Sequence, residues 1–136
     1  MIADTASPSD RASFNGAITA ILSDHATLRH LAAGASKRGF STDDAMSLAE
    51  AMATHERTEA RLFALPFLTH PPETVTVTAA RARQRCLEYT AGNFRPPDAS
   101  AAAALFVDAL LTHLVAEEDW LAQEEEHEKE RLRIIA

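Results

Sequence analysis

The stretch from residue 101 to residue 133, AAAALFVDALLTHLVAEEDWLAQEEEHEKERLR, decides the fold class of this chain. It is rich in alanine, leucine and glutamate, which have the highest helix propensities, and no proline or glycine interrupts it. Its apolar residues recur every three or four positions, which places them on one side of a helix. The stripe consists of Leu105, Phe106, Ala109, Leu110, Leu114, Trp120 and Leu121. We therefore predict a long amphipathic helix that begins after Pro96 and Pro97.

The C-terminal end of this stretch has a different pattern. From Glu124 onward the residues are polar on every side of the predicted helix. We expect a solvated helix end, stabilised by pairs of opposite charge four residues apart, such as Glu125 with Lys129.

Three further helices are predicted on the N-terminal side, because prolines and glycines lie between the periodic segments. The first runs from about Ser9 to Gly34, and the second opens at Ser41, where STDD is close to a capping box, and continues to Pro66. The third runs from about Glu73 to residues 91–93. Its opening TVTVT alternates like a strand, but a lone strand would have no partner in this chain. The sequence predicts an all-α protein, an antiparallel up-down-up-down four-helix bundle.

Length and composition restrict the classes of protein that this chain can belong to. Its 136 residues predict one domain over residues 9–136 after a flexible N-terminus, residues 1–8. With 13 basic and 20 acidic residues the net charge is −7, which disfavours nucleic acid and anionic membranes as partners. No bilayer-spanning helix is expected, because no stretch approaches the roughly 20 apolar residues that one needs. Cys86 is the single cysteine, so no internal disulfide forms, and a cytoplasmic location is expected.

Polar residues interrupt the inward stripe in three of the four predicted helices. His25 lies in the first stripe, His55 and Glu59 in the second, and His113 and Glu117 in the fourth. Each Glu follows its His by four residues, so both side chains of a pair project into the core together. Two buried glutamates would cost several kcal/mol each unless a cation compensates them. A metal ion provides that charge, and imidazole with carboxylate suits iron, manganese or zinc. These five residues are the predicted metal ligands.

The other histidines are not expected to bind metal. His30 lies off the first stripe, His70 lies in a proline-rich loop, and His127 lies in the solvated end. Glu118 and Asp119 flank the fourth-helix pair and are expected to point outward.

Three motifs, DHATLRHL at 24–31, HERTEARLFALPFL at 55–68 and HLVAEEDWL at 113–121, give the chain a family resemblance. From about Ser9 to Leu121 it resembles the hemerythrin-like, or HHE cation-binding, family, whose members hold a non-haem di-iron site inside a four-helix bundle. The resemblance implies that His25, His55 and His113 are terminal ligands. It implies equally that Glu59 and Glu117 bridge the metals.

The third helix departs from the family pattern, because it lacks the two histidines, four apart, that the family normally has there. Arg81, Arg85, Cys86, Glu88 and Tyr89 stand near that height. One metal site could be intact and the other vacant, or Cys86, Glu88 or Tyr89 could complete a mixed site. In a third arrangement, an arginine pairs with the acids and replaces a metal.

The preferred function is binding of non-haem iron, one or two ions, with zinc or manganese as alternatives. Such a site could bind or sense O2, NO or iron through an open coordination position. The sequence contains no phosphate loop, no Ser–His–acid signature and no nucleotide-binding turn. We therefore do not expect an enzyme that acts on an organic substrate. The alternative is a metal-poor or metal-free helical signalling module that binds a protein partner and has lost the third-helix histidines. Metal-dependent melting separates the two hypotheses, since a ligand stabilises the folded state that binds it.

Overall fold

The computed structural model of the chain describes residues 8–65, 71–92 and 94–135. It contains four helices, α1 (Pro8–Arg38), α2 (Thr42–Phe63), α3 (Glu73–Ala91) and α4 (Pro96–Ile135), and no strand within the described residues. The all-α prediction is confirmed, and TVTVT forms part of α3. The predicted flexible N-terminus and the loop that contains His70 lie outside the described residues, except that Pro8 already begins α1.

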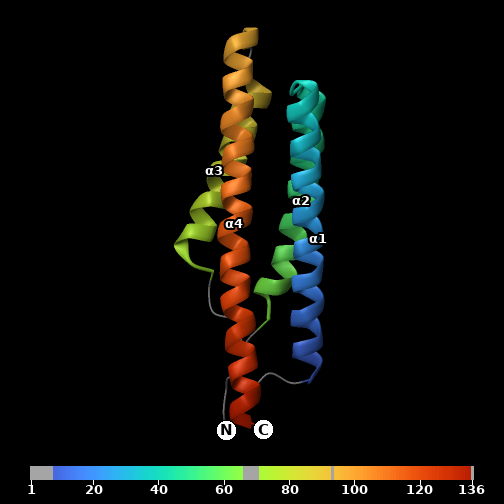
Figure 1. Cartoon of the computed structure of the whole chain (residues 1–136), viewed down its shortest axis with the longest axis vertical. Helices are drawn as coiled ribbons and strands as arrows, with labels where there is room; N and C mark the ends of the chain where they lie inside the picture. The colour runs from blue at the N-terminus through green and yellow to red at the C-terminus, as the bar shows by residue number, and fades with distance from the viewer. Residues whose placement is uncertain (1–7, 66–70, 93, 136) are drawn as a thin grey trace.

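The helices alternate in direction, as predicted for an up-down-up-down bundle. α1 and α3 run in one sense and α2 and α4 in the other, and α4 extends beyond the other helices (Figure 1). Packing is closest between α1 and α2 and between α3 and α4. The contacts of α2 with α3, and of α1 with α4, are sparser, so the bundle consists of two closely packed helix pairs.

Local sequence explains where α1 ends and α2 begins. α1 continues past Gly34, where its end was predicted, because a single glycine inside a helix costs only about 1 kcal/mol. The turn comes at Gly39, whose φ of 85° favours glycine. At α2 the predicted capping box is present: the Asp44 backbone N–H donates to the Ser41 hydroxyl over 3.2 Å, and the Ser41 N–H donates to the Asp44 carboxylate over 3.0 Å.

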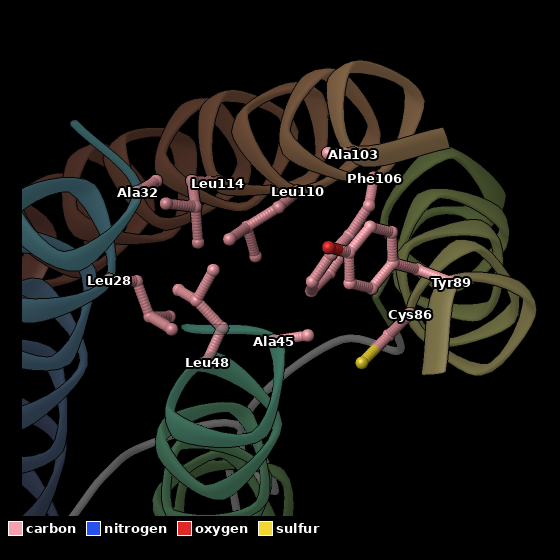
Figure 2. Packing of buried hydrophobic residues seen from close by; sticks show 10 residues of the cluster. All are labelled: Leu28, Ala32, Ala45, Leu48, Cys86, Tyr89, Ala103, Phe106, Leu110 and Leu114. Carbon is pink, nitrogen blue, oxygen red and sulfur yellow. The ribbon is translucent and has the colours of Figure 1, made fainter. Parts of the chain in front are cut away.

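Two apolar clusters fill the bundle at different heights. Figure 2 shows the first, in which side chains from all four helices point into the space between the helices. Its members are Leu28, Ala32, Ala45, Leu48, Cys86, Tyr89, Ala103, Phe106, Leu110 and Leu114. The second cluster consists of Phe14, Ile18, Ile21, Leu62, Val75, Trp120 and Leu121. Between the two lies a layer of polar side chains, so the apolar core is not continuous along the bundle axis.

Some apolar residues at helical spacing point to solvent, among them Leu105, which was predicted to lie in the stripe of the fourth helix. Leu22 is 44% exposed and Leu105 is 50% exposed. Each follows or precedes a residue, Ile21 or Phe106, that is fully buried, and consecutive residues on a helix point about 100° apart. Only one member of each apolar pair can therefore face the core.

The expectation of a fully solvated α4 end is wrong at two positions. Glu124 and Glu128, four residues apart, are buried, and Arg11 Nε of α1 lies 3.3 Å from Glu128 Oε1. On the exposed side, Lys129 pairs with Glu126 over 3.3 Å, where a pair with Glu125 was expected.

The prediction that no stretch approaches bilayer-spanning length is wrong for α4. Within α4, the segment Pro97–Glu130 is long and apolar enough to cross a membrane by length and composition. Core helices of soluble bundles meet the same criterion, and this segment directs His113 and Glu117 into the bundle interior. A single such helix is therefore weak evidence for a membrane span.

Candidate metal centre

The polar layer between the two apolar clusters contains all five predicted ligands. His25, on α1, and Glu117, on α4, are 0% exposed, and the other three are also buried. We call His25, His55, Glu59, His113 and Glu117 the His/Glu centre. The sequence prediction that three helices bring these side chains together in the core agrees with the structure.

Glu117 is the residue of the His/Glu centre that all three histidines face. Its Oε1 lies 3.0 Å from His25 Nε2 and 2.8 Å from His55 Nε2. Its other oxygen, Oε2, lies 3.6 Å from His113 Nε2. Thus three imidazoles from three helices direct the same ring nitrogen toward one carboxylate.

Glu59 completes the arrangement from α2. Its Oε1 lies 3.2 Å from His55 Nε2, one helical turn away. One potential ligand atom from each of His55, Glu59, His113 and Glu117 lies within 4.8 Å of the other three. Atoms that share a metal at about 2.1 Å lie up to about 4.2 Å apart, so this group needs only a small contraction to hold one ion. His25 lies beside the group, with its Nε2 3.3 Å from His55 Nε2.

The outer ring nitrogen of each histidine also has a partner. His25 Nδ1 lies 2.6 Å from Glu118 Oε2, and His55 Nδ1 lies 3.3 Å from Asp24 Oδ2. Carboxylates accept hydrogen bonds, so both Nδ1 atoms carry a proton that they donate. This leaves each Nε2 as the nitrogen whose lone pair can bind a metal, a common second role of carboxylates around metal sites.

Thr78 of α3 plays the same part for His113. The Thr78 hydroxyl donates to the backbone carbonyl of Thr74 over 2.7 Å, one turn earlier. Its oxygen then accepts from His113 Nδ1, which lies 3.1 Å away. A threonine that bonds back to its own helix therefore fixes the tautomer of the third histidine, and Nε2 again faces inward.

Glu118 does not point outward as predicted. Besides His25, it binds Arg29 through two hydrogen bonds, Arg29 Nη1 to Oε2 at 2.6 Å and Nη2 to Oε1 at 2.8 Å. The hydrogen bond from Arg29 is the main reason that the pKa of Glu118 lies below its ordinary value. This bidentate pair holds the carboxylate that orients His25. Asp119, in contrast, is exposed as expected.

The two buried glutamates have opposite protonation preferences. Burial, followed by the hydrogen bond and charge of Glu117, raises the pKa of Glu59 to about 10. Burial alone would raise the pKa of Glu117 as well, but hydrogen bonds from His25, His55 and Glu59 hold it well below its usual range. Without a metal the pair therefore holds one proton, on Glu59, and one negative charge, on Glu117.

The pKa values of His55 and His113 are also shifted in opposite directions. Burial would lower the pKa of His55, but the hydrogen bond and charge of Glu117, and those of Asp24, raise it above its ordinary value. Burial lowers the pKa of His113, which lies farther from Glu117. Contact with Glu117 and Asp24 therefore favours the protonated form of His55, and burial favours the neutral form of His113.

Glu117 Oε2 accepts no hydrogen bond from a histidine. It is buried, and His113 Nε2 lies 3.6 Å from it. In the metal-free centre the proton of Glu59 is the donor available to the Glu117 carboxylate. The three nearby nitrogens and the carboxylate of Glu59 are the donor types that bind iron, manganese or zinc, so the residues present fit a metal ion.

The third helix contributes differently from any of the expected arrangements. Its buried residues at the height of the centre are Thr78 and Ala82, four residues apart. Arg81 is exposed, and Arg85 pairs with Glu88 over 3.0 Å on the surface, so neither arginine replaces a metal. Within the described residues, neither Cys86 nor Glu88 joins a possible metal-binding group.

Cys86 and Tyr89 have roles in packing. Cys86 belongs to the first apolar cluster, and the Tyr89 hydroxyl donates to the Phe40 carbonyl over 3.4 Å. Of the remaining histidines, His30 and His127 are exposed, and His70 lies outside the described residues.

Sequence reasoning missed the three residues that orient the histidines, namely Asp24, Thr78 and Glu118. Two of them carry a signal in the sequence, because Asp24 adjoins His25 and Glu118 adjoins Glu117. The sequence cannot say that each acid reaches a histidine of another helix. Comparison of the chain with protein-family models, with curated proteins and with solved structures gave no match.

Proposed function

We propose that this chain is a hemerythrin-like metal protein that holds non-haem iron in the His/Glu centre and binds or senses O2, NO or iron itself. The observation that carries the proposal is the buried Glu117 carboxylate, toward which the Nε2 atoms of three buried histidines point. His25, His55, His113, Glu59 and Glu117 would hold the metal. Reduced iron with an open coordination position would supply reversible binding of a small gas.

The donors favour one iron over two. A second ion would need further ligands from α3, and that helix offers Thr78 and Ala82 at this height. The Thr78 hydroxyl already bonds to its own helix and to His113, and alanine has no donor atom. We therefore expect the centre to use its three imidazoles and two carboxylates for a single ion.

Reconstitution with Fe(II) under anaerobic conditions is expected to give about one iron per chain by elemental analysis. The loaded protein should melt at a higher temperature than the metal-free protein, by an amount that grows with the free iron concentration. Admission of air should then change the visible spectrum. Two irons per chain would contradict the assignment of a single site, and no uptake with unchanged melting would contradict the proposed function.

A second prediction concerns the carboxylate that orients His25. Glu118→Gln should lower iron affinity roughly 10- to 100-fold, because a neutral amide holds the His25 N–H less strongly and pairs less well with Arg29. Iron titration monitored by fluorescence measures this effect. Asp119→Asn removes the same charge from the next residue, which is exposed, and should leave affinity within about twofold. Equal losses in both variants would assign the effect to net charge.

One observation favours the alternative, a metal-free helical module that binds a protein partner. In the absence of metal the centre already balances its charge, with a proton on Glu59, a hydrogen bond from Glu59 to Glu117 and imidazole donors around Glu117. The fold therefore does not require the ion. Under this alternative, chelation would leave the melting temperature unchanged and the isolated protein would be colourless.

A further inference from the structure

A groove of about 270 Å³ opens on the surface between α2 and α3. The α3 side of this groove presents small side chains, Thr76 and Ala79, which leave space where larger residues would close the interface. This is also where the two helix pairs pack sparsely.

Glu59 connects the groove to the His/Glu centre. It lines the groove, and it is the most exposed of the five candidate ligands at 7%, whereas His25 and Glu117 are fully enclosed. An ion that arrives from solvent through this groove would therefore meet the Glu59 carboxylate before any other ligand.

An ion pair lies at the mouth of the same groove. Arg83 Nη1 of α3 lies 3.1 Å from Glu56 Oε1 of α2, and both residues line the groove. Glu56 and Glu59 are three residues apart on α2, so their carboxylates lie on adjacent turns of one helix face. The side chains of Arg83 and Glu56 are 52% and 46% exposed, and exposed pairs contribute little stability, so this pair opens easily.

We propose that a divalent cation enters the centre through the α2–α3 groove, and that Arg83 slows its entry by occupying Glu56. The inference rests on the proposed function, since it concerns the route to that centre. When the pair is closed, the guanidinium repels an incoming cation and neutralises the outer carboxylate. When the pair opens, Glu56 attracts the cation electrostatically and Glu59 takes it one turn deeper.

A larger groove elsewhere does not offer such a route. It has a volume of about 630 Å³ and is lined by residues of α1 and α4 such as Ala103, Ala104 and Val107, with Phe40 from the turn between α1 and α2. Ala103 belongs to the first apolar cluster, Phe40 and Val107 pack against it, and no member of the His/Glu centre lines that groove. It provides the site for a matched control.

The test is the rate at which metal-free protein takes up Co²⁺, followed by stopped-flow quenching of tryptophan fluorescence. Trp120 is the single tryptophan and lies three residues after Glu117, so it reports on the centre. Ala79→Leu fills the α2–α3 groove, and Arg83→Gln removes the guanidinium that pairs with Glu56 at its mouth. Ala104→Leu adds the same volume to the other groove, and Arg81→Gln removes an exposed charge from the same helix.

We expect Ala79→Leu to slow uptake about tenfold or more, because entry then requires the helices to separate. Arg83→Gln should accelerate uptake roughly 3- to 10-fold, and more at low ionic strength, since a repelling charge is removed from the path. Both controls should stay within about twofold of the parent rate, and all four variants should bind the same amount of Co²⁺ at equilibrium.

The proposed route would be overturned if Ala79→Leu and Arg83→Gln both took up Co²⁺ at the parent rate. It would also be overturned if the controls, Ala104→Leu and Arg81→Gln, changed the uptake rate as much as their matched variants do. A failure of the parent protein to bind Co²⁺ is a different result, because it would overturn the proposed function itself. Far-UV circular dichroism of each variant verifies that the helix content is unchanged, and Arg83→Gln, at a half-exposed position, tests the route even if Ala79→Leu perturbs packing.

Discussion

His55→Ala is expected to reduce iron loading from about one ion per chain to less than about a tenth, with unchanged helix content. His55 contacts both buried carboxylates, at 2.8 Å to Glu117 and 3.2 Å to Glu59, so its removal takes away a nitrogen ligand and the main contact between the two acids. Elemental analysis after anaerobic reconstitution measures loading, and far-UV circular dichroism measures helix content. Glu59→Ala should give the same loss, because it removes an oxygen ligand from the same group.

The matched control is His30→Ala. His30 is also a helical histidine, but it is exposed on α1. It should load iron like the parent protein. If His55→Ala and Glu59→Ala both load iron at the parent level, the ligand assignment is wrong. If His55→Ala loses its helices, the loading result must be replaced by that of Glu59→Ala.

Metal-free Glu59→Gln is expected to be more stable than the metal-free parent protein above pH 5. Glu59 has a folded-state pKa of about 10 against an ordinary value of 4.5, so between these values the unfolded chain binds fewer protons than the folded chain. The stability of the parent protein therefore falls as pH rises through this range, on the order of 3 kcal/mol by pH 7. Glutamine cannot ionise, and its amide can still donate to Glu117.

The measurement is thermal melting in the presence of a chelator at several pH values. The gain from Glu59→Gln should be near zero at pH 4.5 and should grow with pH, reaching roughly 6–12 °C at pH 7. With iron present the order should reverse, because the amide is a poorer ligand than a carboxylate. A variant that melts below the parent protein at every pH, without metal, would contradict the protonated state assigned to Glu59.

The fold could be predicted because its signals are local. The three-and-four spacing of apolar residues identifies each helix, and the prolines and glycines separate them. The predicted end of α1 at Gly34 was wrong. The low helix propensity of one glycine costs less free energy than burial of Ala35 in the last turns of α1 contributes. Glu128 was predicted to face solvent because the residues around it in α4 are polar. Its burial depends on contact with Arg11 of α1, which cannot be inferred from the sequence of α4 alone.

The candidate site was predictable to the extent that it follows helix periodicity. His–Glu pairs four apart must share a face, and that face was already identified as apolar. The partners of the outer ring nitrogens were not predictable, because they depend on the rotation of one helix against another. Glu118 lies about 100° around α4 from Glu117, and the proximity of Arg29 on α1 brings it to His25.

The close packing of α1 with α2 and of α3 with α4 has a consequence for how the molecule folds. Each pair is an αα-hairpin formed by neighbours in sequence, so most contacts are local and folding should be fast. His55 and Glu59 belong to one hairpin, and His113 and Glu117 to the other. A chelating set exists only after the hairpins dock, so a bound ion would act as a cross-link that slows their separation and hence global unfolding.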